Sequence, residues 1–230
     1  MFLPMKLTHR AKLGVGLLCA LCLATEPAAA SETVESQAAA LHELYIFKGD
    51  ASSFRQQSRL ERSEAAAYVV RLDGSEQEAL HLKRSLENTG FTDVDVDDWY
   101  APYVVQASES SIIKGFPDQT FRAEEYVSEQ EFVKMVLAVL GYPQGTDFEW
   151  NDVYSKAEEI GLLDDARTQR DEEGFTKAGA VRYLYRALQL PRKDSEKLLI
   201  EELVERGAIS EDTAEELNLL PSEERPASQE

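Results

Sequence analysis

Cysteine and histidine are both scarce in this 230-residue chain. The two cysteines, Cys19 and Cys22, are too few for a disulfide scaffold. Besides His9 the chain has only His42 and His81, which show no metal-ligand spacing, and it lacks a Gly-x-Ser-x-Gly nucleophile elbow and a phosphate-binding loop. We therefore expect no metal, no cofactor and no enzymatic activity. The remaining catalytic alternative is a glycosidase-type carboxylate pair, which clearing of cell-wall material in a zymogram would support.

Basic residues are also few: 24 lysines and arginines stand against 43 aspartates and glutamates, for a formal net charge of −19. This balance argues against a nucleic-acid binder, because a protein that neutralises phosphates needs a basic face. The hydrophobic content of 43% excludes a largely disordered chain and suffices for one core or two small ones. Any anionic ligand must therefore meet a local basic pocket.

The one long apolar run near the start, residues 13–24, is shorter than the roughly 20 residues that span a bilayer. Three basic residues precede this run and three alanines, residues 28–30, follow it. This pattern predicts a secretory signal peptide over residues 1–30, with an uncleaved membrane anchor as the alternative. Cleavage would leave a cysteine-free chain of net charge −21 with no membrane span. Lipidation is not expected, because leucines precede both cysteines.

A sequence pattern recurs three times along the rest of the chain. Residues 45–50 match residues 111–116, and residues 160–165 form a third, weaker copy. A second apolar helix is expected 10 to 12 residues after the loop in each copy. In the middle copy the first helix is expected over residues 99–110. The second should begin near Ser128, where Glu131 three residues later completes a capping box.

These copies resemble the S-layer homology (SLH) repeat. The middle copy carries nearly the whole pattern of that family: Phe91, Asp93, Val94, Trp99, Gly115, Asp118, Thr120, Phe121 and Glu131. The first copy keeps Gly49, Arg62 and Glu64, and the third keeps Trp150, Asp152, Val153, Thr176 and Lys177. The resemblance covers roughly residues 35–190 and implies SLH-like repeats over residues 31–90, 91–143 and 144–190.

The resemblance implies a mainly α fold in which three repeats form a pseudo-threefold helical bundle. It also implies that secondary cell-wall polysaccharide binds non-covalently in grooves between repeats. The ligand-binding residues it implies are Arg62, Lys177, Trp99, Gly49, Gly115 and Asp118. The motif is eroded, however: Glu129 reverses the charge at the basic position of the second copy, and Gly179 replaces the glutamate of the third.

Each of these residues also has an interpretation that needs no ligand. Arg62 and Lys177 could be exposed surface cations, since isolated surface charges contribute little to stability. Glutamates at the third helical position, such as Glu131, could simply cap their helices. Trp99 and Trp150 are expected to be partly buried packing residues, with stacking on a sugar ring as the alternative. The acidic cluster around residues 93–98 does not follow the calcium-loop pattern.

Two further helical segments are expected outside the copies. One follows the third copy, and the other lies between the first and the second. Residues 191–220 predict a helical hairpin, with a first helix over residues 195–206 and a second capped by Ser210. Its many glutamates argue against a DNA-reading helix-turn-helix. Residues 75–89 are either a linker helix or an extension of the first copy's second helix. The last ten residues, 221–230, are expected to be disordered.

The expected function is attachment of an exported protein at a bacterial cell envelope, in the wall or the S-layer. The expected partner is cell-wall polysaccharide or an envelope protein. The rival hypothesis is a secreted protein–protein interaction module that keeps the fold without binding glycan. The salt dependence of binding separates the two hypotheses. Charge-based glycan binding should weaken as the ionic strength rises, whereas binding through an apolar protein interface should not.

Overall fold

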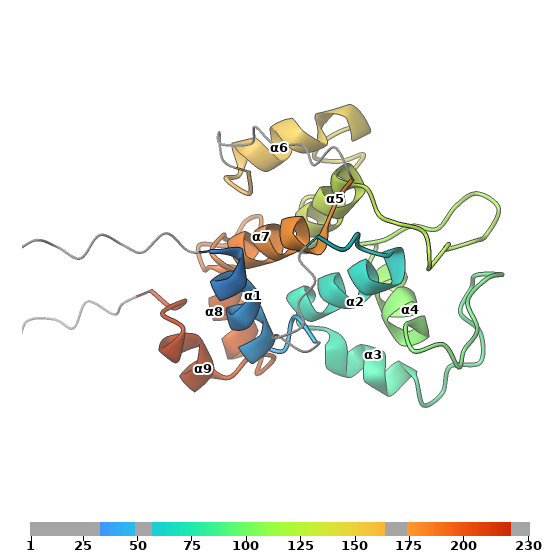
Figure 1. Ribbon diagram of the computed structural model, residues 1–230, viewed down its shortest axis with the longest axis horizontal. Helices are drawn as coiled ribbons and strands as arrows, with labels where there is room; N and C mark the ends of the chain where they lie inside the picture. Colours follow the sequence, from blue (N-terminus) through green and yellow to red (C-terminus); the bar gives the residue numbers. More distant parts are fainter. Residues whose placement is uncertain (1–32, 49–56, 164–173, 222–230) are drawn as a thin grey trace, which may run out of the picture. The chain divides into compact units, whose positions relative to one another are not determined.

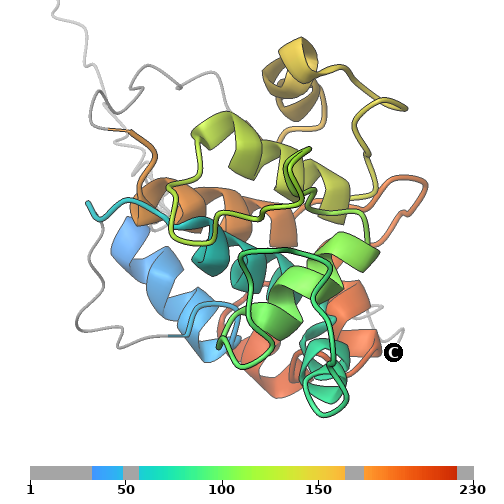
Figure 2. The same ribbon diagram turned by 90° about the vertical axis from the view of Figure 1, so that its right-hand side faces the viewer.

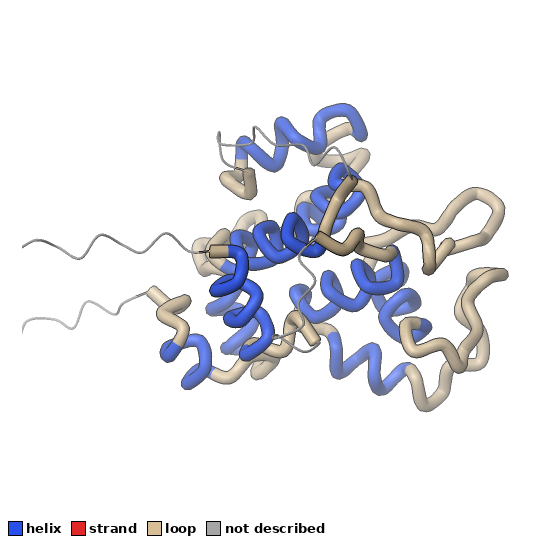
Figure 3. Tube along the Cα trace, viewed as in Figure 1, coloured by secondary structure: helices blue, strands red, loops and turns tan. Residues whose placement is uncertain are grey.

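Helices joined by loops make up the part of the chain that the structure describes (Figure 3). A computed structural model describes residues 33–48, 57–163 and 174–221, all within the second of the chain's two units, residues 32–230. The predicted signal peptide, Gly49 and residues 222–230 lie outside the described residues. The mainly α fold class is confirmed. In the described ranges, no helix combines the length and apolarity needed to cross a bilayer.

Figure 1 labels the helices in chain order. They are α1 (Val34–Glu43), α2 (Arg62–Asp73), α3 (Glu76–Leu82), α4 (Ala101–Glu109), α5 (Glu129–Val139), the 3-10 turn η2 (Trp150–Asp152), α6 (Val153–Glu159), α7 (Lys177–Leu188), α8 (Leu199–Glu205) and α9 (Glu211–Glu216). Several helices begin away from the residue that the sequence predicts. The helix expected over residues 99–110 spans Ala101–Glu109.

The three predicted copies contain the helix pairs α1 and α2, α4 and α5, and α6 and α7. The first helix of each pair packs on the second helix of the preceding pair: α4 lies on α2 and α6 lies on α5. The series closes on itself, because α1 packs on α7 (Figures 1 and 2). No pair buries its apolar faces alone, and the three pairs share one hydrophobic core.

The helices α2, α5 and α7 supply the centre of this core and point the same way. At their N-terminal ends, the backbone N–H of Arg62 donates to the carbonyl of Glu125 at 2.9 Å, and that of Lys177 donates to Ser58 at 2.9 Å. At their C-terminal ends, the Arg192 guanidinium donates to the carbonyls of Val139 at 2.9 Å and Asp73 at 3.2 Å. A cation here satisfies carbonyls that the helices leave unpaired and complements the helix dipoles.

The same turn ends the first helix of every pair. A residue in the left-handed region follows each helix, and the next two backbone N–H groups both donate to one carbonyl of the last turn. The left-handed residues are Tyr45 (φ 58°), Ser111 (φ 58°) and Gly161 (φ 76°), and the accepting residues are Leu41, Ala107 and Ala157. Tyr45 and Ser111 are the first residues of the predicted first and second copies (residues 45–50 and 111–116), whereas Gly161 is the second residue of the predicted third copy (residues 160–165).

Helix α3 is a separate helix, which decides between the two interpretations of residues 75–89. Gly74 ends α2 with a φ of 78°, a conformation that costs other L-residues about 1–2 kcal/mol. Glu76, in the first turn of α3, accepts hydrogen bonds from Lys48 (2.7 Å), Arg71 (2.8 Å) and Tyr103 (2.9 Å). Burial opposes ionisation of Glu76, but these three hydrogen bonds outweigh it and lower its pKa. This network joins α2, α3 and α4.

The C-terminal hairpin docks against the C-terminal end of α2. Arg206 donates to the carbonyl of Asp73 at 2.9 Å, and Leu203 packs so closely that a Cβ added to Gly74 would lie 2.5 Å from its Cδ2. The first helix of the hairpin begins at Leu199 rather than at the predicted residue 195. Ser210 is the N-cap of α9, as expected, but its side chain makes no capping hydrogen bond.

Candidate functional site

Arg62, the basic residue of the first copy, is buried where the N-terminal ends of α2 and α5 meet. Its side chain is only 5% exposed. Nε donates to the carbonyl of Phe121 at 2.9 Å, and Nη1 pairs with Glu131 at 3.0 Å. The guanidinium also lies 4.9 Å from the ring centre of Phe116. Burial lowers the pKa of Arg62, and the charge of Glu131 opposes that shift. The interpretation of Arg62 as an exposed surface cation is therefore wrong, because its side chain is buried and bound within the fold.

Lys177, the basic residue of the third copy, makes the corresponding contact at the junction of α7 and α2. Its Nζ lies 2.5 Å from Glu64 Oε1, and the two side chains are 21% and 24% exposed. Glu64 and Glu131 also close the capping boxes of α2 and α5, which confirms their predicted structural role. Both cations that sequence analysis assigned to the ligand thus have carboxylate partners within the fold.

The junction of α5 and α7 is built differently. Glu129 replaces the cation there and accepts a hydrogen bond from Tyr183 at 2.5 Å. On the other side, Gly179 has no room for a larger residue, since an added Cβ would lie 2.7 Å from the ring of Phe175. The ring of Phe175 packs 5.2 Å from Phe132 and 6.1 Å from Tyr183, centre to centre. Among the described residues, this junction is formed by the aromatic cluster and by two hydrogen bonds to Glu129, the second from the hydroxyl of Tyr154 at 3.4 Å.

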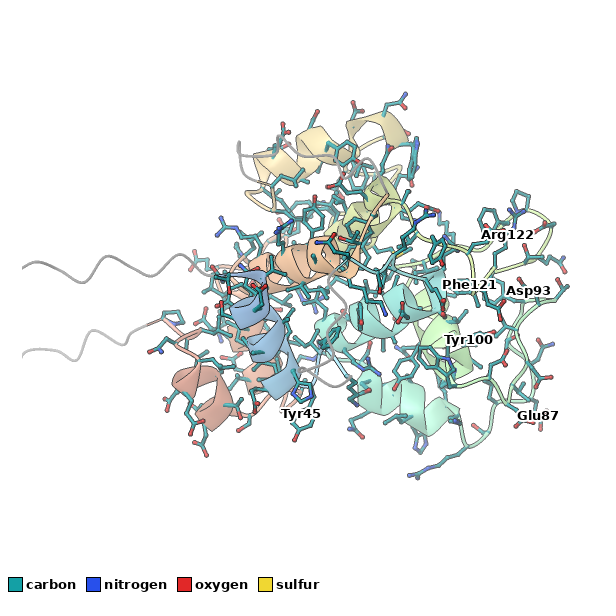
Figure 4. The ribbon with its side chains drawn as sticks, viewed as in Figure 1. Tyr45, Glu87, Asp93, Tyr100, Phe121 and Arg122 are labelled. Carbon is teal, nitrogen blue, oxygen red and sulfur yellow. The ribbon has the colours of Figure 1, made fainter. Side chains whose placement is uncertain are left out.

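The loop between α4 and α5 is fixed by carboxylates. Figure 4 shows Asp93 beside Phe121 and Arg122, and its two oxygens each accept a backbone N–H from these residues at 2.7 Å. Asp118 accepts hydrogen bonds from the hydroxyl of Thr120 at 2.6 Å and its backbone N–H at 3.1 Å, which lower its pKa. Asp118 therefore orders the loop that carries it.

Gly115 allows the same loop to close over an aromatic ring. A Cβ added there would lie 2.3 Å from Phe91 Cε1 and 2.9 Å from the carbonyl of Thr120. The ring of Phe91 in turn packs on Phe121, with the ring centres 5.6 Å apart. Glycine is therefore required because of close approach rather than an unusual backbone angle.

The two tryptophans are more exposed than packing residues would be. Trp99 is 52% exposed and Trp150 is 39% exposed. Trp99 contacts Tyr100 edge to face, with ring centres 5.5 Å apart, and Tyr103 at 6.4 Å. The exposed indole face of Trp99 leaves the alternative of stacking on a sugar ring open.

A hollow of about 360 Å³ lies beside this loop. Its lining combines two aromatic rings, several hydroxyls and one cation: Thr89, Gly90, Phe91, Ser108, Ser111, Ile113, Lys114, Gly115, Phe116 and Gln119. Of the six residues that sequence analysis named, Gly115 contributes to this lining. Arg62 reaches its edge through the ring of Phe116.

Two lysines near Arg62 were not singled out by sequence analysis as ligand residues. Lys114 lines the hollow, and Lys134 stands one helical turn after Glu131 on α5. Within the described ranges, no hydrogen bond or ion pair engages either lysine. Burial lowers the pKa of Lys134, and the positive charges of Lys114 and Arg62 lower it further. No signal in the sequence distinguishes Lys134, which belongs to no motif and is not among the buried apolar residues of α5.

Residues 90–133, which hold the loop, all but one of the residues that line the hollow and the first five residues of α5, match the model of the S-layer homology domain. This segment is similar to an SLH domain. It begins one residue before the predicted middle copy, residues 91–143, and ends within it.

Parts of this chain are similar to parts of much longer surface proteins. It is 37% identical over 110 residues to a "Surface layer protein" of Brevibacillus choshinensis and 39% identical over 102 residues to a "Middle cell wall protein" of Brevibacillus brevis. It is also 23% identical over 180 residues to "Cell surface glycoprotein 1" of Acetivibrio thermocellus. These matches cover 47%, 44% and 74% of this chain but only 10%, 9% and 7% of the relatives. They support a secreted protein of the bacterial cell envelope.

Proposed function

We propose that this protein attaches non-covalently to the bacterial cell wall by binding a wall polysaccharide. The observation that carries the proposal is the SLH-like segment at residues 90–133, whose loop borders a hollow lined by aromatic rings, hydroxyls and a lysine. Sugars present apolar C–H faces, hydroxyls and, in many wall polymers, acidic groups. The aromatic rings of the lining can pack on the C–H faces, its hydroxyls can form hydrogen bonds with the sugar hydroxyls, and its lysine can pair with an acidic group.

We further propose that residues 31–90, 91–143 and 144–190 are three SLH-like repeats arranged about a pseudo-threefold axis. Three features support this arrangement: the closed series of helix contacts, the recurring left-handed turn and the parallel course of α2, α5 and α7. In this proposal residues 1–30 are the signal peptide that exports the chain.

A specific observation favours the alternative of a protein-binding module without glycan affinity. The cations at the motif position of the first and third repeats, Arg62 and Lys177, are both held by carboxylates of the fold, and the second repeat has Glu129. A groove whose motif cations are all neutralised or reversed has less attraction for an acidic polymer.

Co-sedimentation with purified wall sacculi tests the proposed function. Sacculi of Brevibacillus brevis are used intact and after chemical removal of their secondary polysaccharide. The protein should pellet with intact sacculi, and pelleting should decrease as the salt concentration rises. Equal pelleting with both preparations would contradict polysaccharide binding. Absence of pelleting would favour a protein partner.

A further inference from the structure

Cations outnumber carboxylates at the junction of α2 and α5. Arg62 pairs there with Glu131, while Lys114 and Lys134 make no hydrogen bond or ion pair among the described residues. Together with Arg122, Glu125 and Asp93, whose charges also act on Arg62, four cations and three carboxylates carry a net charge of +1. This local excess stands out in a chain whose overall charge is −19.

We propose that Lys114 and Lys134, rather than Arg62, hold the acidic group of a wall sugar at the hollow beside Phe116. This inference rests on the proposed polysaccharide binding and assigns the charge recognition within it. The ligand class is a sugar that carries a carboxylate. Arg62 is a positioning residue in this scheme, because its guanidinium is engaged by the Phe121 carbonyl and by Glu131.

The position of the two lysines follows from the contacts of Arg62. Its guanidinium lies over the ring of Phe116, two residues after Lys114, and its Nη1 contacts Glu131, one turn before Lys134. Arg62 therefore lies between the segments that carry the two lysines. The charge of Lys114 helps to lower the pKa of Lys134, which is consistent with this placement.

The surroundings of Lys114 offer the other contacts that a sugar ring needs. The rings of Phe91 and Phe116 supply apolar faces, and the hydroxyls of Ser108 and Ser111 lie in the same hollow. Neither hydroxyl donates a side-chain hydrogen bond to another described residue. A carboxylated sugar would therefore replace water at free hydroxyls and neutralise a charge excess, without breaking an existing pair.

The other two junctions lack this combination. In the first repeat the residue that corresponds to Lys114 is Lys48, and it is bound to Glu76 at 2.7 Å. In the third repeat the residue at the corresponding sequence position is Asp164, which lies outside the described residues, and Glu129 occupies the place of Arg62. Among the described residues, the structure thus assigns one acidic-sugar site, at the junction of α2 and α5.

Equilibrium binding of the full protein to polysaccharide purified from Brevibacillus brevis walls tests this assignment. The polymer is used native and after its carboxylates have been converted to amides. The protein should prefer the native form. Lys114→Gln and Lys134→Gln should each raise the Kd roughly tenfold, because each removes a charge-assisted hydrogen bond.

Arg182→Gln is the matched control. Arg182 is an exposed cation six residues after the N-cap of α7, as Lys134 is six residues after the N-cap of α5. Its loss should leave the Kd unchanged. Thermal denaturation provides a second measurement: Lys134→Gln should keep or raise the Tm, because the half-buried charge of Lys134 has no partner among the described residues. A structural lysine would instead lower the Tm when replaced.

The outcomes separate this inference from the proposed function. If the wild-type protein binds the native polymer but both lysine variants bind equally well, the inference is wrong and polysaccharide binding stands. Equal binding of native and amidated polymer would also overturn the inference. If the wild-type protein binds neither polymer, both the proposed function and the inference fail.

Discussion

Replacing Arg62 by alanine should destabilise the protein before it affects any ligand. The substitution removes a guanidinium whose side chain is 5% exposed and which contacts the Phe121 carbonyl and Glu131. It leaves the carbonyl without its side-chain donor and the carboxylate of Glu131 without its cation. It also opens a space beside the rings of Phe116 and Phe121, over which the guanidinium lies at 4.9 and 5.0 Å.

The size of the effect follows from the burial of the pair. Removing one partner of a fully buried ion pair costs about 3–5 kcal/mol. Glu131 is 30% exposed and keeps its hydrogen bonds with Ser128, so water can partly solvate the orphaned carboxylate. We therefore expect a loss of about 2–3 kcal/mol. For a chain of this size that corresponds to a fall in Tm of roughly 5–10 °C.

Thermal denaturation followed by circular dichroism measures this fall. Arg182→Ala serves as the control and should change the Tm by less than about 2 °C, because surface substitutions rarely exceed 0.5 kcal/mol. Arg62→Lys should have an intermediate Tm, because an ammonium group cannot contact both the Phe121 carbonyl and Glu131 with the geometry of a guanidinium. If Arg62→Ala keeps the wild-type Tm and loses polysaccharide binding, Arg62 is a ligand residue and its assignment as a positioning residue is refuted.

Three further predictions concern the helix ends and the loop. Glu76 has a lowered pKa in the folded state, so its stabilising effect is complete at neutral pH and is lost as the pH falls below the ordinary carboxyl range. Glu76→Gln should therefore lower the Tm at pH 7 and reduce the Tm difference between pH 7 and about pH 3. Equal pH profiles of the two proteins would contradict this. Gly74→Ala should lower the free energy of unfolding by at least about 1 kcal/mol, because alanine is strained at this backbone angle. The added methyl group should also displace Leu203 and accelerate amide hydrogen exchange in α8. Unchanged exchange would show that the hairpin does not depend on this contact. Gly115→Ala should displace Phe91 and weaken polysaccharide binding, whereas a wild-type Kd would exclude the hollow as the site.

The sequence predicted the helices well where a periodic apolar face coincided with a capping signal. Ser128 and Glu131 marked the start of α5, and the structure confirms both halves of that capping box. The starts of α4 and α8 were less accurate. Before α4 the chain forms local turns, in which Asp98 and Ala101 donate their backbone N–H groups to the carbonyls of Asp95 and Asp98, both at 3.1 Å. The start of α8 is held by a contact with an earlier segment. Leu199 donates its backbone N–H to the carbonyl of Leu190 at 2.8 Å.

The candidate site was less predictable than the fold. Motif position identified Arg62 and Lys177, but it could not show that carboxylates from neighbouring helix pairs already hold them. Those contacts join residues 69 and 113 positions apart in the sequence. Lys134 has no motif that distinguishes it from other lysines. Its importance depends on the absence of a partner, which only the three-dimensional arrangement reveals.

The central claim is that this chain binds an acidic wall polysaccharide at the hollow of its SLH-like segment. The most direct test is two-dimensional ¹H–¹⁵N NMR of the labelled protein, titrated with fragments of Brevibacillus brevis wall polysaccharide. We predict that the chemical-shift changes concentrate at residues 89–91, 108–119 and 134. Changes confined to Lys177 and Glu64, or a spectrum that the polysaccharide leaves unaltered, would contradict the claim.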